Sequence, residues 1–142
     1  MVQTTNNLTS GELRLVDANL NRLREGVRVV EDICRFIYDN FELTQALKNI
    51  RHSIKSSLLL EALSNRNIIG DCSRNTISSE AMRKDIKSIL IANFKRAEES
   101  ARVLEEILKL YDISEAEKLK QIRYALYDVE KRLFQEMEKE LA

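Results

Sequence analysis

The stretch ANLNRLREGVRVVEDI, residues 18–33, decides the fold of this chain. Its apolar residues Leu20, Leu23 and Val27 are three or four positions apart, which is the spacing of one face of an α-helix. At about 100° per residue, Asn19 falls inside the same apolar stripe. Burying an amide without a hydrogen-bond partner costs about 1–3 kcal/mol, so we expect Asn19 to meet another polar group, water or a ligand.

The same pattern occurs a second time, as ANFKRAEESARVLEEI at residues 92–107. Eight of the sixteen aligned residues are identical without a gap, and Asn93 takes the place of Asn19. Two unrelated helices of this composition would share about a tenth of their positions, so the match indicates an internal repeat. Because Asn93 departs from the apolar pattern at the same helical angle as Asn19, the pair favours a site or a polar core network, either structural or functional.

The helices that follow the two repeated segments also agree. LKNIRH at residues 47–52 parallels LKQIRY at residues 119–124, so Arg51 corresponds to Arg123. A helical hairpin that is too thin to bury its own apolar face must pack against its copy. We therefore predict an all-α fold, a bundle of four main helices built from two duplicated helical hairpins with pseudo-two-fold symmetry.

Composition and periodicity set the expected elements of a single domain over residues 1–142. The chain lacks proline and is rich in Leu, Ala, Glu, Lys and Arg, which lose little rotamer freedom in helices. Thr9 with Glu12, and Ser114 with Glu117, have the spacing of capping boxes. The pattern predicts a disordered tail over 1–10, helices over 11–39 and 43–63, a loop over 64–78, and helices over 79–111 and 115–141. The repeat halves are 11–63 and 79–141.

The charge balance argues against nucleic-acid and membrane partners. The 23 basic and 23 acidic residues are mixed at short range, so no basic field attracts nucleic acid or anionic lipid. No apolar run approaches the roughly 20 residues of a membrane span, and the start MVQTTNNLTS does not resemble a signal peptide. Cys34 and Cys72 lack CxxC spacing, and His52 is the single histidine, which argues against a zinc site or disulfide framework. We expect a cytoplasmic protein.

Several segments together resemble the alternative hydroxymethylpyrimidine-phosphate kinase family of thiamin biosynthesis. The resemblance covers residues 12–134 and rests on VDANLNRLREGVRVVEDICRFIYDN, LKNIRH, the GD of the loop, ANFKRAEESARVLEEILKL and IRYALYDVEK. It implies phosphorylation of 4-amino-5-hydroxymethyl-2-methylpyrimidine phosphate to its diphosphate, with ATP and Mg²⁺. The family also occurs as a helical domain fused N-terminal to thiamine phosphate synthase, which makes that synthase an expected functional partner. Because a synthase barrel needs about 250 residues, we expect the stand-alone form.

The resemblance places the expected site on polar residues of both copies. The candidates for catalysis are Asp17, Glu25, Glu31, His52 and Glu105. The candidates for binding substrate or phosphate are Asn19, Arg22, Arg28, Arg51, Asn93, Arg96, Arg102 and Arg123. The candidates for binding Mg²⁺ are Glu31, Asp71 and Glu105. Two further matching positions are Asp32 and Glu99.

The chemistry of these side chains is compatible with phosphoryl transfer. The sequence has no GxxxxGK(S/T) loop and no glycine-rich kinase loop, so a nucleotide would have to be held by side chains. Arginine suits this task because its planar guanidinium binds phosphate oxygens bidentately, while carboxylates with Mg²⁺ neutralise the remaining charge. An amide such as that of Asn19 both donates and accepts hydrogen bonds, as recognition of an aminopyrimidine edge requires.

Alternatives stay open at the level of sequence. The pattern also fits a non-catalytic module that binds a phosphorylated pyrimidine or nucleotide, or a structural bundle whose repeats dimerise, and the long amphipathic helices are compatible with a homodimer. Glu25 and Arg28 have the spacing of ordinary surface ion pairs. Asp71 is either a turn former or a metal ligand, and His52 either a solvated side chain or a base. Cys34 lies on the apolar stripe and is expected to pack in the core.

Overall fold

The computed structural model describes residues 8–77 and 82–141, and these residues form helices and no strands. The prediction of an all-α fold is confirmed. None of the described helices is both long and apolar enough to cross a membrane. The elements are α1 (Ser10–Asp32), its continuation as a π-helical turn η1 (Ile33–Ile37), α2 (Phe41–Ser53), α3 (Leu59–Ser64), α5 (Ile86–Leu108) and α6 (Ile113–Leu141).

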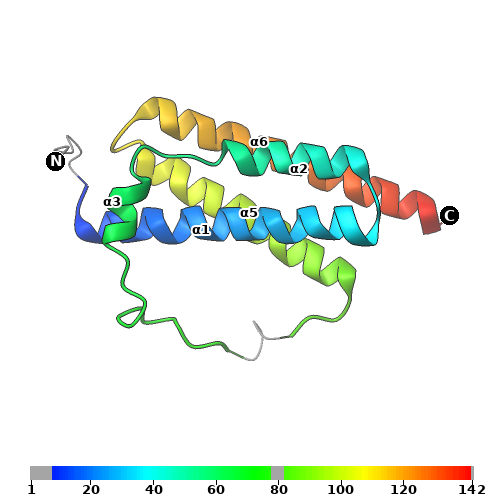
Figure 1. The fold of residues 1–142 in the computed structure, drawn as a ribbon, viewed down its shortest axis with the longest axis horizontal. Coiled ribbons are helices and arrows are strands. Elements are labelled where there is room, and N and C mark those ends of the chain that lie inside the picture. Colours follow the sequence, from blue (N-terminus) through cyan, green and yellow to red (C-terminus); the bar gives the residue numbers. More distant parts are fainter. Residues whose placement is uncertain (1–7, 78–81, 142) are drawn as a thin grey trace.

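The two long helices α1 and α5 pack on each other and run in opposite directions (Figure 1). Helix α2 contacts α1, α6 contacts α5, and α2 and α6 contact each other, so the four helices enclose one core. Helix α3 packs on α1. Residues 65–77 and 82–85, which we call the linking segment, lie on the side of α1 that faces away from α2 and α6 (Figure 1). The pseudo-two-fold relation between the hairpins α1–α2 and α5–α6 stays a prediction.

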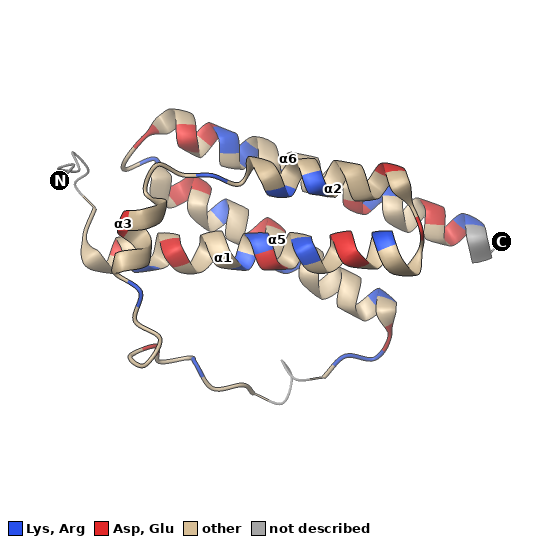
Figure 2. Cartoon of the chain, viewed as in Figure 1, with Lys and Arg blue, Asp and Glu red and all other residues tan. Residues whose placement is uncertain are grey.

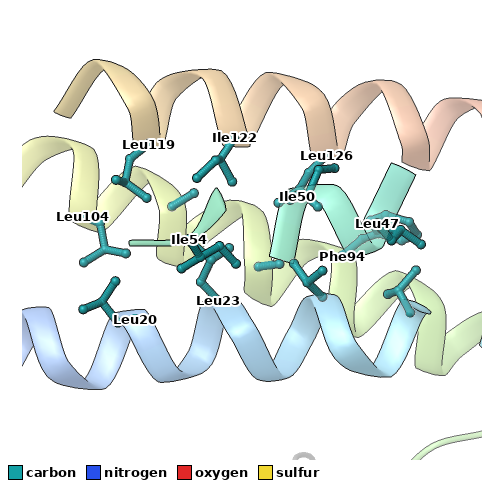
Figure 3. Close-up of a cluster of buried hydrophobic side chains, with 14 of the residues drawn as sticks. Leu20, Leu23, Leu47, Ile50, Ile54, Phe94, Leu104, Leu119, Ile122 and Leu126 are labelled. Atoms are coloured by element: carbon teal, nitrogen blue, oxygen red, sulfur yellow. The ribbon is translucent and has the colours of Figure 1, made fainter. Parts of the chain in front are cut away.

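The apolar stripes predicted from the sequence face this core. Leu20 and Leu23 of α1 lie in one cluster of buried side chains with Phe94 of α5 and with Leu119 and Leu126 of α6 (Figure 3). Burial of a Leu or Phe side chain stabilises a fold by about 1.5–3 kcal/mol. Because the cluster draws on both predicted hairpins, neither hairpin is expected to be stable without the other.

Helices α1 and α5 approach each other closely at Gly26. A Cβ atom at this position would lie 3.0 Å from the carbonyl oxygen of Asn93 and 3.3 Å from the Cβ of Ala97. Glycine inside a helix costs about 1 kcal/mol relative to alanine, so the close approach, rather than helix propensity, explains this residue. The approach brings the segment 18–33 directly against its repeat at 92–107.

The predicted helix over residues 43–63 is wrong as a single element. Helix α2 ends before Ile54, whose backbone is extended with ψ of 97°. The carbonyl of Ile54 accepts a hydrogen bond from the guanidinium of Arg24 at 2.9 Å, and the hydroxyl of Ser57 donates to the carboxylate of Glu115 at 2.6 Å. Both partners are distant in sequence, so the helical period of this segment does not reveal the break.

The starts of the last two long helices also differ from the prediction. Residues 82–85 are not helical, because the carboxylate of Asp85 accepts from the backbone N–H of Ser88 at 2.8 Å and caps α5. Before α6, the carboxylate of Asp112 accepts from the backbone N–H and the hydroxyl of Ser114 at 2.9 and 2.8 Å. Asp112, and not Ser114, therefore supplies the capping hydrogen bonds at this end.

The start of α1 follows the prediction more closely. Thr9 and Glu12 form the expected capping box, with hydrogen bonds of 3.1 and 2.9 Å. Of the predicted tail over 1–10, residues 1–7 lie outside the described residues, and Ser10 already belongs to α1. The predicted first helix over 11–39 is continuous through the π-helical turn and ends at Ile37.

Candidate functional site

A groove runs along α1, between α5 and the segment that links α3 to α5. It consists of two adjoining cavities of about 770 and 740 Å³. Each cavity has the size of a small-molecule site, and both together are large enough for two ligands. We call them together the α1/α5 groove. Both cavities are lined by Ala18, Asn19, Arg22, Asp71 and Val103.

The two cavities differ in the side chains that each adds to this shared wall. The larger one lies beside the first half of α1, and we call it the apolar compartment because it alone adds the apolar side chains Leu15 and Ile68, with Cys72. It also adds Gly11 and the polar or charged residues Arg14, Asp17, Asn21, Arg66 and Asn67. The other one reaches the middle of α5, and we call it the cationic compartment. It adds Ser73, Arg74, Thr76, Arg83, Arg96, Glu99 and Ser100.

Asn19 lies at the junction of the two compartments. The side chain is only 4% exposed, and its amide nitrogen donates to the carbonyl of Leu15, one helical turn earlier, at 2.9 Å. Asn93, in the second copy, makes the same bond to Ile89 at 2.8 Å. This bond uses one N–H, so the carbonyl oxygen and the second N–H of Asn19 have no partner among the described residues. A buried amide with unused donor and acceptor is suited to binding a ligand edge.

The cationic compartment contains arginines that lack a carboxylate partner. Within residues 8–77 and 82–141, the guanidinium groups of Arg22, Arg74 and Arg96 form no ion pair and no hydrogen bond. Arg22 comes from the first copy of the repeat and Arg96 from the second, and the packing of α1 on α5 brings both to one cavity. Unpaired guanidinium groups around a concave surface form a binding site for phosphate oxygens.

Two carboxylates line the same compartment. One oxygen of Asp71 accepts a hydrogen bond from the backbone N–H of Ser73 at 3.0 Å, which is a turn-forming contact. The carboxylate of Glu99 has no partner in the described part of the chain. The sequence left open whether Asp71 forms a turn or binds a ligand, and the structure shows that it forms the turn while still lining the groove.

Asp17, one of the predicted catalytic residues, forms an ion pair with Arg66. Both of its carboxylate oxygens accept hydrogen bonds from Arg66, at 2.6 and 2.7 Å, and the side chain is buried. Because Arg66 follows α3, this bidentate pair fastens the start of the linking segment to α1 and so builds one wall of the apolar compartment. In the repeat, Ile91 stands where the first copy has Asp17, so this contact belongs to the first copy alone.

Glu31 and Glu105 form matching ion pairs within their hairpins. The Arg51 guanidinium donates to Glu31 at 2.7 and 3.1 Å, and that of Arg123 donates to Glu105 at 3.1 and 2.9 Å. Burial by itself would raise the pKa of the Glu31 carboxyl, but the hydrogen bond and charge of Arg51 outweigh it and hold that pKa below its usual value. None of these four residues lines the α1/α5 groove.

The three residues predicted to bind Mg²⁺ do not come together. Glu31 and Glu105 are engaged in ion pairs, whereas Asp71 lies in the groove. The residues that the structure describes contain no group of three His, Cys, Asp or Glu side chains placed to hold a metal ion. A phosphate-bound Mg²⁺ needs only one or two carboxylates, and in this groove Asp71 and Glu99 would supply them.

The remaining candidates lie outside the groove. Glu25, Arg28 and His52 line a separate depression of about 560 Å³ between α1 and α2. Arg102 is exposed and pairs with Glu106 at 3.0 Å. Asn93 is half-buried and lines neither compartment. Cys34 is fully buried in the core, as expected, and burial raises the pKa of its thiol to about 11.

Several groove residues were not found from the sequence. Arg66 and Arg74 lie in the predicted loop over 64–78, where no helical period assigns a side chain to a face. Arg83 lies within the predicted helix over 79–111 but before the observed start of α5. Ser100 is buried and donates to the carbonyl of Arg96 at 2.6 Å. The one signal for Ser100 was its position, because it is the repeat equivalent of Gly26, where α1 meets α5.

Comparisons with known proteins identify a family and several related sequences. The sequence model of the ThiD2 family matches residues 14–132. Thiamine-phosphate synthase of Nostoc punctiforme is 42% identical over 121 residues, and that of Synechocystis is 42% identical over 123 residues. These matches cover 84% of this chain and 34% and 35% of the relatives. Thiamine-phosphate synthase of Rhodopirellula baltica is 33% identical over 135 residues, or 92% of this chain and 35% of the relative.

The chain thus spans about a third of the length of the curated relatives that it matches. No solved structure matches it at a significant level. The matched family segment begins in α1 and ends in α6, so it includes both copies of the repeat and the linking segment between them. From the extent of this match, the chain belongs to the ThiD2 family.

Proposed function

We propose that this chain is a phosphotransferase of thiamin biosynthesis that phosphorylates 4-amino-5-hydroxymethyl-2-methylpyrimidine phosphate from ATP. The proposal is supported by one observation above all, the α1/α5 groove, which is lined both by the amide of Asn19, whose oxygen has no partner among the described residues, and by three guanidinium groups without an ion pair there. The sequence resemblance to the pyrimidine-phosphate kinases supplies the identity of the substrates. ATP, Mg²⁺ and the kinase reaction all belong to this proposal.

The two compartments suggest how the substrates would lie. The aminopyrimidine ring would occupy the apolar compartment, with its amino group and ring nitrogen on the amide of Asn19. The phosphates would lie in the cationic compartment against Arg22, Arg74 and Arg96. Mg²⁺, held by phosphate oxygens with Asp71 or Glu99, would neutralise charge on the transferred group.

In this arrangement the chain contributes mostly position and charge. The hydroxymethyl oxygen of the substrate would form a bond to the γ-phosphorus of ATP, the bond from that phosphorus to the bridging oxygen would break, and ADP would leave. The hydroxyl proton would pass to a carboxylate of the groove, Asp71 or Glu99, and then to solvent. Such a reaction needs little covalent participation by the protein, so arginines that stabilise the developing charge suffice.

The ion pairs in and around the groove would act by holding its walls. The pair of Asp17 with Arg66 fixes the linking segment, and the pairs of Glu31 and Glu105 with their arginines fix α2 and α6 to their partner helices. These carboxylates are therefore proposed as positioning residues, and not as general bases or metal ligands.

The test follows ADP formation with ATP, Mg²⁺ and the pyrimidine monophosphate. We expect Arg96→Ala to lower kcat/KM by on the order of 100-fold, since one group that stabilises transition-state charge is worth about 2.7–4 kcal/mol. Arg102→Ala is the matched control, because Arg102 lies on the same helix but is exposed outside the groove. Binding of both ligands without any ADP would refute the kinase reading.

The length of the relatives favours a second candidate function. Because the chain corresponds to about a third of each synthase, the domain could serve as a binding module that holds a phosphorylated pyrimidine for a synthase without transforming it. This reading predicts that the pyrimidine phosphate raises Tm in the absence of ATP and that the chain binds a thiamine-phosphate synthase. It also predicts no ADP under any condition of the assay above.

A further inference from the structure

A second charged cavity lies at the tip of the first hairpin, outside the α1/α5 groove. It has a volume of about 540 Å³ and lies between the end of α1, the π-helical turn and the start of α2. We call it the hairpin-tip cavity. It is lined by Arg28, Glu31, Arg35, Asp39, Asn40, Phe41, Thr44, Gln45, Lys48 and Arg51.

The basic side chains that line this cavity outnumber the acidic ones. Four of these side chains are basic and two are acidic, so the cavity has a formal charge of +2. Arg51 is paired with Glu31, and Arg28 is paired with Asp32 at 3.3 Å. Arg35 and Lys48 form no ion pair with any described residue, so both are available to an anion.

Aromatic rings lie beside these free cations. Phe41 lines the cavity, and its side chain is 74% exposed. The guanidinium of Arg35 lies over the ring of Phe36, 4.8 Å from its centre, which holds that cation at the rim. An exposed ring next to unpaired cations suits a ligand that joins a planar ring to phosphate groups.

The backbone at the hairpin tip is irregular in the first copy alone. The residues Ile33–Ile37 form a π-helical turn, and Asp39 has φ of 48°, a conformation that few residues other than glycine adopt. In the repeat, α5 ends without a π-helical turn, and the stretch from Ile107 to Leu119 is two residues shorter than that from Ile33 to Leu47. The two extra residues thus accompany an irregular backbone at this tip, and such departures from regular structure often mark binding sites.

The basic surface continues beyond the cavity. Arg28 and Arg51 also line the depression between α1 and α2, together with Arg24, His52 and Lys55 and with the acidic Glu25. Figure 2 shows Lys and Arg on both α1 and α2, alternating with Asp and Glu along α1. A surface of this length can contact more than one phosphate group, so its charge matches a diphosphate better than a single phosphate.

We infer that the hairpin-tip cavity is a second ligand site, which binds an organic diphosphate with its phosphates on Arg35 and Lys48 and its ring on Phe41. This site is separate from the α1/α5 groove and does not depend on the proposed kinase reaction. Its ligand could be a nucleoside diphosphate or another ring-bearing diphosphate, since both present the same two recognition elements.

The test is a titration of the full ¹⁵N-labelled chain with inorganic pyrophosphate and with ADP, followed residue by residue by NMR. Both ligands are expected to shift the amides of residues 35–48 in a saturable way, whatever happens at the groove. Lys48→Glu should weaken pyrophosphate binding about tenfold, as expected for loss of a charge-assisted contact. Phe41→Ala should weaken ADP binding by roughly fivefold and leave pyrophosphate binding unchanged, since pyrophosphate has no ring.

Lys120→Glu is the matched control, because Lys120 is the repeat equivalent of Lys48 on a hairpin without the cavity. The inference is overturned if pyrophosphate leaves the amides of 35–48 unshifted, or if Lys120→Glu weakens binding as much as Lys48→Glu. A loss of the site at residues 35–48 together with normal ADP formation would remove this inference and keep the proposed function. The reverse result would keep the site and remove the kinase.

Discussion

Glu98 is expected to make this protein less stable as the pH rises. The residue lies on α5, is only 4% exposed, and has one carboxylate oxygen without a hydrogen-bond donor among the described residues. Burial and, to a smaller extent, the neighbouring Glu130 of α6 together raise the pKa of Glu98 to about 8, although Lys95 partly opposes both. The ammonium of Lys95 lies 3.2 Å from each of the two carboxylates, so one cation serves two acids.

The size of the effect follows from proton linkage. The pKa of Glu98 is about 8 in the folded protein against 4.5 for an unperturbed group, and each unit corresponds to about 1.4 kcal/mol. A group that titrated alone would thus contribute up to about 5 kcal/mol, and sharing a proton with Glu130 reduces our expectation to about 2–4 kcal/mol. Because the folded pKa is raised, this stability is fully present below pH 4.5 and is lost as the pH rises through about 8.

Urea denaturation followed by circular dichroism at several values between about pH 5 and pH 9 measures this effect. The free energy of unfolding of the wild type should fall over this range, while that of Glu98→Gln should stay nearly level and exceed the wild-type value by about 2–4 kcal/mol at the alkaline end. Glu99→Gln, the exposed neighbour on the same helix, should follow the wild type. Wild-type stability that is level or rises between about pH 5 and pH 8 would refute the reasoning.

Three further expectations test the core and the ion pairs. Leu23→Ala removes a fully buried side chain and should lower the free energy of unfolding by about 3 kcal/mol, seen as a lower urea midpoint at constant slope. Arg51→Ala leaves the buried Glu31 unpaired and should cost about 3 kcal/mol at neutral pH, whereas a Glu31→Leu, Arg51→Met double variant should recover most of it; equal losses would contradict this. Arg66→Ala should speed hydrogen exchange in residues 66–77, with α5 unchanged as the internal control, because it releases the linking segment from Asp17.

The helices could be predicted from the sequence wherever residues close to one another in the chain determine them. The period of Leu20, Leu23 and Val27 predicts α1, and the spacing of Thr9 and Glu12 predicts its start, because both depend on neighbours within one or two helical turns. The break at Ile54 was not readable, because Arg24 and Glu115 stabilise it from distant parts of the chain. The start of α5 was predicted too early, at residue 79, for a different reason. Asp85 caps the helix through a hydrogen bond from Ser88, and the prediction did not use this local signal.

The site was readable only in part. The sequence identified Asn19, Arg22 and Arg96 as candidates for binding substrate or phosphate, and all three line the α1/α5 groove. It could not separate these arginines from Arg51 and Arg123, because pairing depends on which side chain lies opposite in space. The groove also includes Arg74, which lies in the predicted loop, so no helical face could be assigned to it in advance, and Arg83, which the sequence placed in a helix that begins only at Ile86.

The sequence by itself thus determined that the chain is all-helical, that one segment is repeated, and that each copy has an asparagine within its apolar stripe. These features could be found because the helical period and the identity of the repeats are properties of neighbouring residues. Only the tertiary structure decided which charges remain free. The packing of α1 on α5, and the linking segment held by Asp17 and Arg66, leave Arg22 and Arg96 without carboxylates, while the hairpin partners of Arg51 and Arg123 neutralise them. The physical reason is that an ion pair depends on distance across the fold, which a one-dimensional pattern does not contain.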